Sequence, residues 1–216
     1  MSYNIILNRG EIESQIKKFL TDFHNHSSEL TFKKGIYLYG SSGCGKTHFV
    51  RNILQEMDYD IINYDAGDVR NKALIETITS NNISNRNVLD MMNRKDKKIA
   101  IIMDEIDGMN NGDKGGINAL IKIIRQKKTK KQKAENMTKN PIICIGNYYI
   151  DKKIKELMKV CHTFELKTPT NVQMEKIIEL EHPSLNEEFK KKFINYCQSD
   201  IRKLHTIFHL LRNNQD

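Results

Sequence analysis

The sequence predicts an α/β fold in which helices cover both faces of a parallel sheet and a small helical unit follows. Short apolar runs of strand-forming residues occur at 36–39, 99–103 and 142–145, a further strand is expected at 59–64, and segments with helical patterns lie between these strands. Strands that are buried on both faces read as continuous apolar runs, and the helices between them connect parallel neighbours. After residue 168 the apolar residues recur only at helical spacing.

Two helices are expected before the second strand. The first lies within residues 10–23, where apolar residues recur at spacings of three and four: Ile12, Ile16, Phe19, Leu20 and Phe23. The second runs from Lys46 to about Met57, directly after the first strand and a glycine cluster. This order of strand, glycine-rich turn and helix is typical of a βαβ unit.

The last part of the chain is expected to form a small unit of three helices. Two patterns there fit the capping box that opens a helix, Thr170-x-x-Gln173 and Ser184-x-x-Glu187. Apolar residues then recur at helical spacing to residue 211. We therefore divide the chain into an α/β domain at residues 1–167 and a helical domain at 168–216.

Length and composition favour one intracellular protein with a charged surface. The chain has 216 residues, of which 38% are apolar and 29% charged. No run of apolar residues is long enough to span a membrane, and residues 1–9 do not resemble a secretory leader. None of the four cysteines is spaced as C-x-x-C, so neither a zinc site nor a redox motif is predicted.

The positive charge is concentrated in one segment. Residues 122–139 contain eight basic residues and one acidic residue, a surplus of seven in a chain whose net charge is +8. Such a segment fits a polyanionic partner, nucleic acid above all, and it equally fits a solvated loop. The charge pattern alone leaves both interpretations open.

The residues after the first predicted strand fit the phosphate-binding pattern G-x-x-x-x-G-K-[ST] in full. They are Gly40, Ser41, Ser42, Gly43, Cys44, Gly45, Lys46 and Thr47. Glycines let backbone N–H groups converge on phosphate oxygens, and the helix that follows adds the positive end of its dipole. Lys46 would supply a charge to the β- and γ-phosphates, and the Thr47 hydroxyl would be a Mg²⁺ ligand. The sequence therefore predicts a site for ATP and Mg²⁺.

Polar residues follow the next two buried strands. The run at 99–103 ends in Asp104 and Glu105. An aspartate that a strand delivers beside the phosphate loop holds Mg²⁺ in P-loop enzymes, and a carboxylate next to it can deprotonate the attacking water. The following strand ends at Asn147, whose side chain is a candidate for contact with the γ-phosphate or the water, although asparagine after glycine is also ordinary in turns.

These motifs, in this order, resemble an AAA+ ATPase of the clamp-loader clade. The stretch from Asp104 to Met109, followed by Asp113-Lys114-Gly115-Gly116-Ile117, is similar to the large subunit of replication factor C. Other similar stretches are Tyr64–Arg70, Pro141–Asn147 and Ser199–Leu204. The resemblance covers roughly residues 30–212. It implies a parallel five-stranded sheet between helices, followed by a three-helix lid.

The resemblance also implies roles for matching residues. Asn147 would be sensor 1, and Arg202 would be sensor 2, reaching from the lid to the γ-phosphate. Both would act with Lys46 and Glu105 in catalysis. Arg70 and Lys114 would lie near a DNA phosphate. The partners implied are primer–template DNA, a sliding clamp and other clamp-loader subunits in a hetero-oligomer, at a nuclear or cytoplasmic replication site or in a viral factory.

One departure concerns the arginine that small clamp-loader subunits provide to a neighbour's ATP site. The corresponding stretch here, Met158–His162, contains no arginine. The large subunit also lacks this residue, so the departure agrees with the large-subunit resemblance. It implies that this chain does not activate the ATP site of a neighbour. The resemblance further implies that its own site at Gly40–Thr47 needs an arginine from another protein for full turnover.

Other functions stay open at this point. One is a P-loop kinase of a small molecule, although no site for a second substrate is evident and the helical C-terminal unit fits it poorly. A standalone AAA+ remodeller or helicase loader would have the same fold and a different cargo. An ATP-binding structural subunit would hydrolyse almost nothing, although the Asp104–Glu105 pair argues against it.

Overall fold

The computed structural model describes residues 3–26, 29–65, 98–111, 114–133, 138–147 and 152–213. Its centre is a parallel five-stranded sheet in the order β2-β3-β4-β1-β5. The strands are β1 (Gly35–Gly40), β2 (Tyr59–Tyr64), β3 (Lys98–Met103), β4 (Ile142–Gly146) and β5 (His162–Leu166). The predicted α/β fold is confirmed, and the four segments predicted as strands are four of the five strands.

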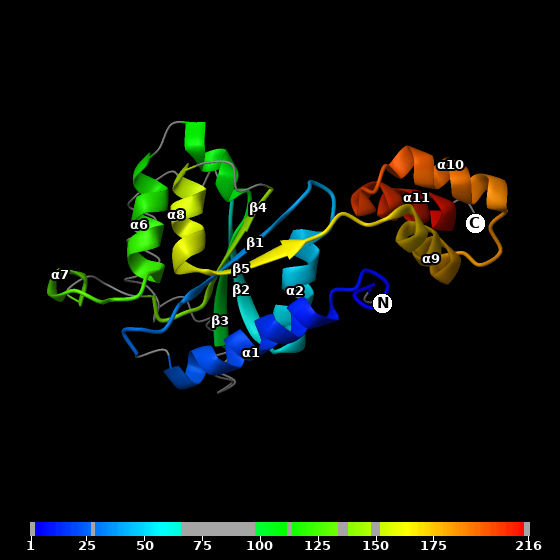
Figure 1. The fold of residues 1–216 in the computed structure, drawn as a ribbon. Helices are drawn as coiled ribbons and strands as arrows, with labels where there is room; N and C mark the ends of the chain where they lie inside the picture. The colour runs from blue at the N-terminus through cyan, green and yellow to red at the C-terminus, as the bar shows by residue number, and fades with distance from the viewer. Residues whose placement is uncertain are drawn as a thin grey trace.

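Helices cover both faces of the sheet (Figure 1). On one face lie α1 (Gly10–His26) and α2 (Lys46–Glu56), and on the other lie α6 (Lys114–Ile124) and α8 (Lys152–Val160). Two short helices, η1 (Ile106–Asn111) and α7 (Lys130–Lys133), flank α6 in the chain. No helix in the described part of the chain is long and apolar enough to cross a membrane.

The core consists of two apolar layers, one on each face of the sheet, because alternate residues of each buried strand point to opposite faces. Ile36 and Leu38 of β1 pack with α1 and α2, whereas Tyr37 packs with α6 and α8. This double burial explains why β1, β3 and β4 appear in the sequence as continuous apolar runs.

No residues were predicted for β5, the fifth strand. This strand lies at the edge of the sheet and pairs with β1. Leu166 is its one buried residue, whereas His162, Thr163 and Glu165 are exposed. A strand that faces solvent along most of its length lacks a continuous apolar run, which is the signal that identified β1, β3 and β4.

The C-terminal helices have a core of their own and group to one side of the sheet (Figure 1). They are α9 (Asn171–Glu181), α10 (Glu187–Cys197) and α11 (Ile201–Asn213). The capping box at Thr170 is confirmed, since the Thr170 side chain accepts from the N–H of Gln173. The chain division at 167/168 stays a prediction.

The predicted capping box at Ser184 is wrong. The N-cap of α10 is Asn186, whose side chain accepts from the backbone N–H of Glu188 at 3.3 Å. Asparagine is as good an N-cap residue as serine, and Asn186 directly precedes the first helical residue. The helix therefore begins two residues later than the serine pattern predicts.

All four cysteines are buried free thiols, in agreement with their spacing. Burial raises the pKa of Cys144 well above its usual range and that of Cys161 to about 12. Protonated, buried thiols are poor nucleophiles and poor metal ligands, so these two cysteines contribute to packing.

Gly40 stands where β1 passes the end of β5, and we expect Gly40→Ala to be strongly destabilising. A Cβ at residue 40 would lie 2.3 Å from the carbonyl oxygen of Leu166, which belongs to the backbone and cannot move aside cheaply. The expected loss in the free energy of unfolding is about 3 kcal/mol, measured by urea denaturation. Gly10→Ala is the control, because a Cβ there meets nothing within 4 Å. Equal midpoints for the two variants would contradict this account.

Candidate functional site

The loop between β1 and α2 has the backbone of a phosphate cradle. Gly43 and Gly45 adopt φ angles of 78° and 86°, in the left-handed region that other residues enter only at a cost. Gly45 is the N-cap of α2, and no described side chain caps that end. The first N–H groups of the helix therefore point, with its positive dipole end, toward the space in front of the loop.

Lys46 holds this loop from within. Its buried ammonium donates to the carbonyl oxygens of Gly40 and Ser41, at 3.0 and 2.8 Å, and to Oδ1 of Asn147 at 3.0 Å. The structure thus brings together two predicted site residues from different strand ends. These three acceptors are neutral oxygens, so they do not neutralise the positive charge of the ammonium. That charge can therefore attract phosphate oxygens.

Thr47 and Asp104 form the next pair. The Thr47 hydroxyl donates to Oδ2 of Asp104 at 2.6 Å, across the carboxyl ends of β1 and β3. Two oxygens bound to one Mg²⁺ at right angles lie about 2.9 Å apart, since each bond is about 2.05 Å. The pair therefore fits two neighbouring positions of a Mg²⁺ ion. The described residues contain no group of three or more His, Cys, Asp or Glu side chains that could hold a metal ion.

Glu105 has an unusual backbone. Its φ angle is 52°, in the left-handed region, and its N–H donates to Oδ1 of Asp104 at 2.9 Å. A non-glycine residue in this region is strained and persists when the surroundings enforce it. β3 ends at Met103, and Glu105, the second residue after it, is exposed, so water can reach its carboxylate.

Asp107 completes a chain of hydrogen bonds that the sequence reasoning did not assign. Its carboxylate accepts from the backbone N–H of Asn147 at 3.3 Å and from Nδ2 of Asn147 at 3.1 Å. Asn147 is therefore held between Lys46 and Asp107, with its amide oxygen toward the ammonium. The acidic run after β3 was the available signal, but spacing alone did not show which strand end Asp107 faces.

If Asn147 acts as the predicted sensor 1, Asp107→Ala should lower kcat for ATP hydrolysis about tenfold, because the Asn147 amide would lose the carboxylate that holds it in place. The KM for ATP should change little, since Lys46 keeps its loop contacts. Steady-state kinetics separate the two constants. Asp107→Asn keeps one acceptor oxygen and should restore part of kcat. A melting temperature that falls while kcat stays constant would show that Asp107 is merely structural.

The helical unit touches the loop through the start of α11. The N–H of Ile201 donates to the carbonyl oxygen of Gly43 at 2.9 Å, and Nη2 of Arg202 donates to Oγ of Ser42 at 2.8 Å. Arg202 also pairs with Asp200 at 3.3 Å. The structure thus places the predicted sensor arginine at the phosphate loop. Asp200, which the sequence reasoning gave no role, holds this arginine and fills the space that a Cβ of Gly43 would need.

A cavity of about 280 Å³ lies beside the loop, between residues 3–9, α2 and α11. Leu7, Phe49 and Ile201 give it apolar walls, and Tyr3 and His205 add polar groups. Burial, together with the nearby His48, lowers the pKa of His205, so its ring is neutral at neutral pH. Apolar walls with a few polar groups suit a flat heterocycle.

Arg9 connects this cavity to the loop. It is 5% exposed, its Nη2 donates to the carbonyl oxygen of Cys44 at 2.6 Å, and its guanidinium lies over the ring of Phe49. Burial lowers the pKa of Arg9, yet a guanidinium stays charged in proteins. The sequence contains no motif around Arg9, because its role depends on a tertiary contact.

Two predicted residues fall wholly or partly outside what the structure describes. Arg70 lies outside the described residues. Lys114 is the first residue of α6, and its side chain lies outside the described part of the chain.

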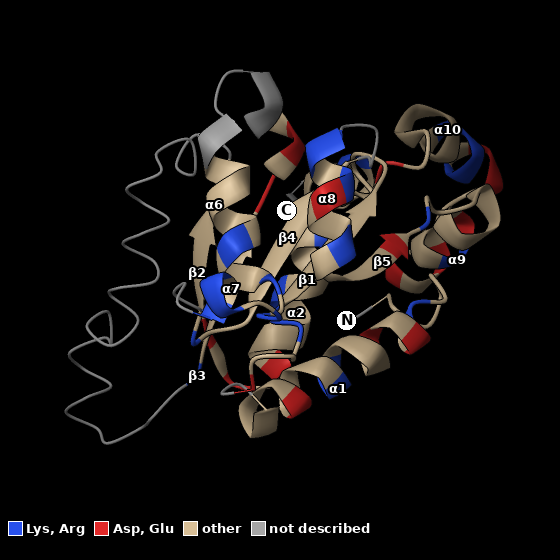
Figure 2. Ribbon diagram, turned by 60° about the vertical axis from the view of Figure 1, so that its left-hand side comes forward, with Lys and Arg blue, Asp and Glu red and all other residues tan. Residues whose placement is uncertain are grey.

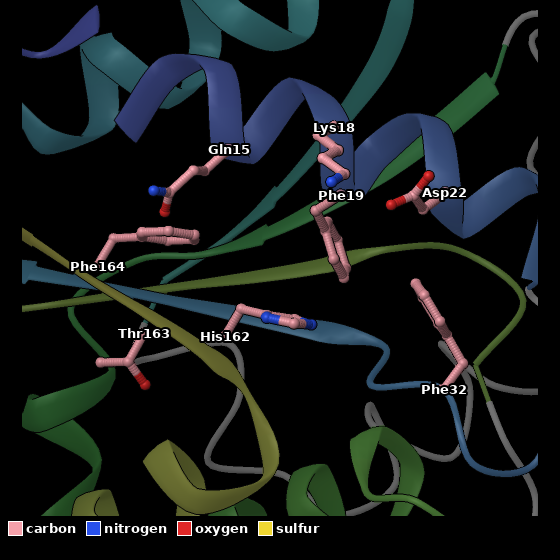
Figure 3. Close-up of a pocket in the computed structure, with 8 residues that line it drawn as sticks. All are labelled: Gln15, Lys18, Phe19, Asp22, Phe32, His162, Thr163 and Phe164. Carbon is pink, nitrogen blue, oxygen red and sulfur yellow. The ribbon is translucent and has the colours of Figure 1, made fainter. Parts of the chain in front are cut away.

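A second cavity, of about 400 Å³, lies between α1 and the edge strand β5 (Figure 3). Phe19, Phe32 and Phe164 give it apolar walls, and Lys18 and Asp22 stand on its rim (Figure 3). It contains none of the predicted site residues and is separate from the phosphate loop.

Comparison with known proteins supports the same family and fold. The model of the ATPase family associated with various cellular activities (AAA) matches residues 36–169, more than half of the chain. Replication factor C subunit 1 of Saccharomyces cerevisiae is 28% identical over 91% of this chain. The same subunit of Oryza sativa subsp. japonica is 37% identical over 67% of the chain, and the replication factor C large subunit of Methanococcus aeolicus is 28% identical over 74%. The chain spans 24%, 14% and 30% of these relatives' lengths, respectively.

Solved structures agree on the fold. The replication initiator DnaA bound to AMPPCP and single-stranded DNA superposes with a TM-score of 0.54 and 16% identity, over 90% of this chain and 59% of its own. A chain of the E. coli MS115-1 HORMA:CdnC:Trip13 complex gives a TM-score of 0.55 and 14% identity, over 86% of this chain and 72% of its own. At these identities the likeness concerns the fold alone.

The resemblance to replication factor C large subunits is therefore confirmed, at modest identity and over most of the chain. The segment that the family model matches contains β1, the phosphate loop, β3, β4 and β5. This chain belongs to the AAA family of ATPases.

Proposed function

We propose that this chain binds and hydrolyses ATP as the AAA+ module of a clamp-loader subunit similar to the large subunit of replication factor C. The observation that carries the proposal is the set of contacts joining Lys46 to Asn147 and Thr47 to Asp104. These contacts gather an ammonium, an amide and two Mg²⁺-type oxygens at one edge of the sheet. The relatives named above support the clamp-loader part.

In this proposal the loop residues 40–47 hold the phosphates through backbone N–H groups and the Lys46 ammonium. Thr47 and Asp104 would hold Mg²⁺, which supplies charge stabilisation at the β- and γ-phosphates. Glu105 orients the attacking water and accepts its proton. Asn147, held by Asp107, positions its amide toward the same water or the γ-phosphate.

In the same proposal, the cavity binds the adenine of ATP and the helical unit covers the site. Adenine would lie between Leu7, Phe49 and Ile201, in the cavity beside the loop. Residues 168–216 would form the lid, and Arg202 would exchange its contact with Ser42 for the γ-phosphate. The affinity for ATP would then depend on the angle between lid and sheet.

The stretch Met158–His162, which joins α8 to β5, contains no arginine, so in the proposal this chain does not provide one to a neighbour's ATP site. In the proposal, a neighbouring subunit supplies an arginine to the ATP site of this chain. Primer–template DNA and a sliding clamp would be the other partners, with Arg70 and Lys114 near DNA phosphates. The protein would act inside the cell, at sites of replication.

The test is ATP hydrolysis by the purified chain, measured with and without primed DNA, a sliding clamp and small loader subunits. Low activity alone and a sharp rise with these partners is the expected result. Strong activity that ignores DNA and partners, together with self-assembly into a ring on gel filtration with ATP, would favour a standalone remodeller. EDTA should abolish hydrolysis under every condition, because Thr47 and Asp104 would lose their ion.

A further inference from the structure

The chain carries a basic surface at the end of α6 and around α7. It consists of six exposed lysines: Lys122, Lys128, Lys130, Lys131, Lys133 and Lys139. No acidic residue occurs in the sequence between residues 122 and 133. Figure 2 shows the basic positions on α7 and on the neighbouring part of α6.

The basic surface is anchored to the core on both sides of α7. Before α7, the N–H of Lys127 donates to the carbonyl oxygen of Leu30 at 2.7 Å, and the buried Lys127 ammonium donates to the carbonyl oxygen of Lys122. After α7, the buried Lys34 ammonium donates to the carbonyl oxygen of Thr138 at 3.3 Å. Two buried lysines thus fix the backbone from which the exposed lysines project, which differs from a loop that is only solvated.

A reciprocal cap holds α7 itself. The N–H of Gln132 donates to Oγ1 of Thr129 at 3.2 Å, and Oε1 of Gln132 accepts from the N–H groups of Lys128 and Thr129. This arrangement is a capping box. It stabilises a single helical turn in which three of four residues are lysine, and so it presents their ammonium groups together.

The basic surface is remote from the ATP site. It precedes the first residue of β4, whereas Asn147 follows the last, so the two are separated by the length of that strand, roughly 15 Å. Figure 1 shows α7 and the C-terminal helices at opposite ends of the molecule. The surface therefore has no part in nucleotide chemistry.

The composition of this surface indicates its partner. Residues 125–133 are arginine, lysine, glutamine and threonine only. An anionic membrane is held best by a surface that adds apolar groups to its charge, and a protein partner is held mainly by aromatic and apolar anchors. A phosphate backbone needs neither, because lysine, arginine, glutamine and threonine are its usual donors.

We propose that the basic surface binds the phosphate backbone of duplex nucleic acid without reading its sequence. This contact goes beyond the proposed function, because it is separate from the ATP site and does not require that the chain load a clamp. Its strength depends on counterion release, so it weakens steeply with salt.

The test is the affinity of the full chain for a fluorescein-labelled DNA duplex, measured by anisotropy over a range of salt concentrations. One variant replaces four lysines of the surface by glutamine: Lys128, Lys130, Lys131 and Lys133. The matched control replaces four exposed lysines elsewhere: Lys155, Lys176, Lys191 and Lys192. The first variant should bind at least about tenfold more weakly, and its salt slope should fall by about 0.9 for each phosphate that is no longer neutralised. The control should bind like the wild type.

Equal weakening in both variants would show that only net charge matters, and it would overturn the proposal. So would unchanged binding by the first variant, or tighter binding of phosphatidylserine vesicles or polyglutamate than of the duplex. A second readout uses the wild-type chain alone: bound duplex should protect Lys128–Lys133 from acetylation, and an absence of protection would also overturn the proposal. ATP hydrolysis without DNA should be equal in all variants, so a failure here is distinct from a failure of the proposed function.

Discussion

Glu105→Gln is expected to lower kcat for ATP hydrolysis about 10²- to 10⁴-fold, because the amide cannot accept the proton of the attacking water. The affinity for ATP should stay close to that of the wild type, since the loop, Lys46 and the Thr47–Asp104 pair are unchanged. Single-turnover hydrolysis and equilibrium binding of a fluorescent ATP analogue measure the two effects separately. Wild-type turnover in this variant would instead support a structural subunit that only binds ATP.

The backbone at Glu105 provides a control for this experiment. Glutamine tolerates a φ angle of 52° no better than glutamate does, so Glu105→Gln should leave stability unchanged. Asparagine enters the left-handed region more readily. Glu105→Asn should therefore also abolish hydrolysis but raise the free energy of unfolding, by about 0.5–1 kcal/mol. If the strained backbone at Glu105 serves to position the catalytic base, the asparagine variant should be more stable and less active than the wild type.

Lys46→Met is expected to raise the Kd for ATP about ten- to hundredfold, because hydrogen bonds to charged groups contribute about 1.5–3 kcal/mol each. Methionine keeps much of the buried stem and removes the ammonium that contacts Gly40, Ser41 and Asn147. Titration with a fluorescent ATP analogue in the presence of Mg²⁺ measures the change.

Lys190→Met is the matched control for this variant. Lys190 is also nearly buried, but it pairs with Glu187 and Glu179 in the helical unit. Its loss should lower stability and leave the Kd for ATP unchanged. If both variants bound ATP equally well, the proposed place of the phosphates would be wrong.

Much of the fold was predictable because its signals are local. The runs that became β1, β3 and β4 are apolar on both faces, and the cap at Thr170 needs residues only three positions apart. The edge strand β5 lacks such a signal, since most of its residues face solvent. At α10, two residues of equal capping propensity compete, and only the structure shows that Asn186 begins the helix.

In the candidate site, too, the residues that belong to local motifs were predictable and those that depend on tertiary contacts were not. The pattern of residues 40–47 identifies the phosphate-binding loop without other information. The carboxyl ends of adjacent parallel strands lie at the same edge of a sheet, so Asp104 and Asn147 are expected beside that loop. The contacts of Asp107 and Arg9 join residues 40 and 35 positions apart. No spacing rule relates such pairs, so these residues emerge only once the sheet and its flanking segments are assembled.

The contact between Gly43 and the start of α11 has a mechanical consequence. Because Gly43 has no side chain, the Asp200 carboxylate packs directly against its backbone. The N–H of Ile201 donates to the carbonyl oxygen of Gly43 at the same place. The phosphate-binding loop thus also contacts the C-terminal helices directly. Because α11 contacts the loop at its first turn, a small rotation of that turn would displace the other end of the helix, near Asn213, by a larger distance.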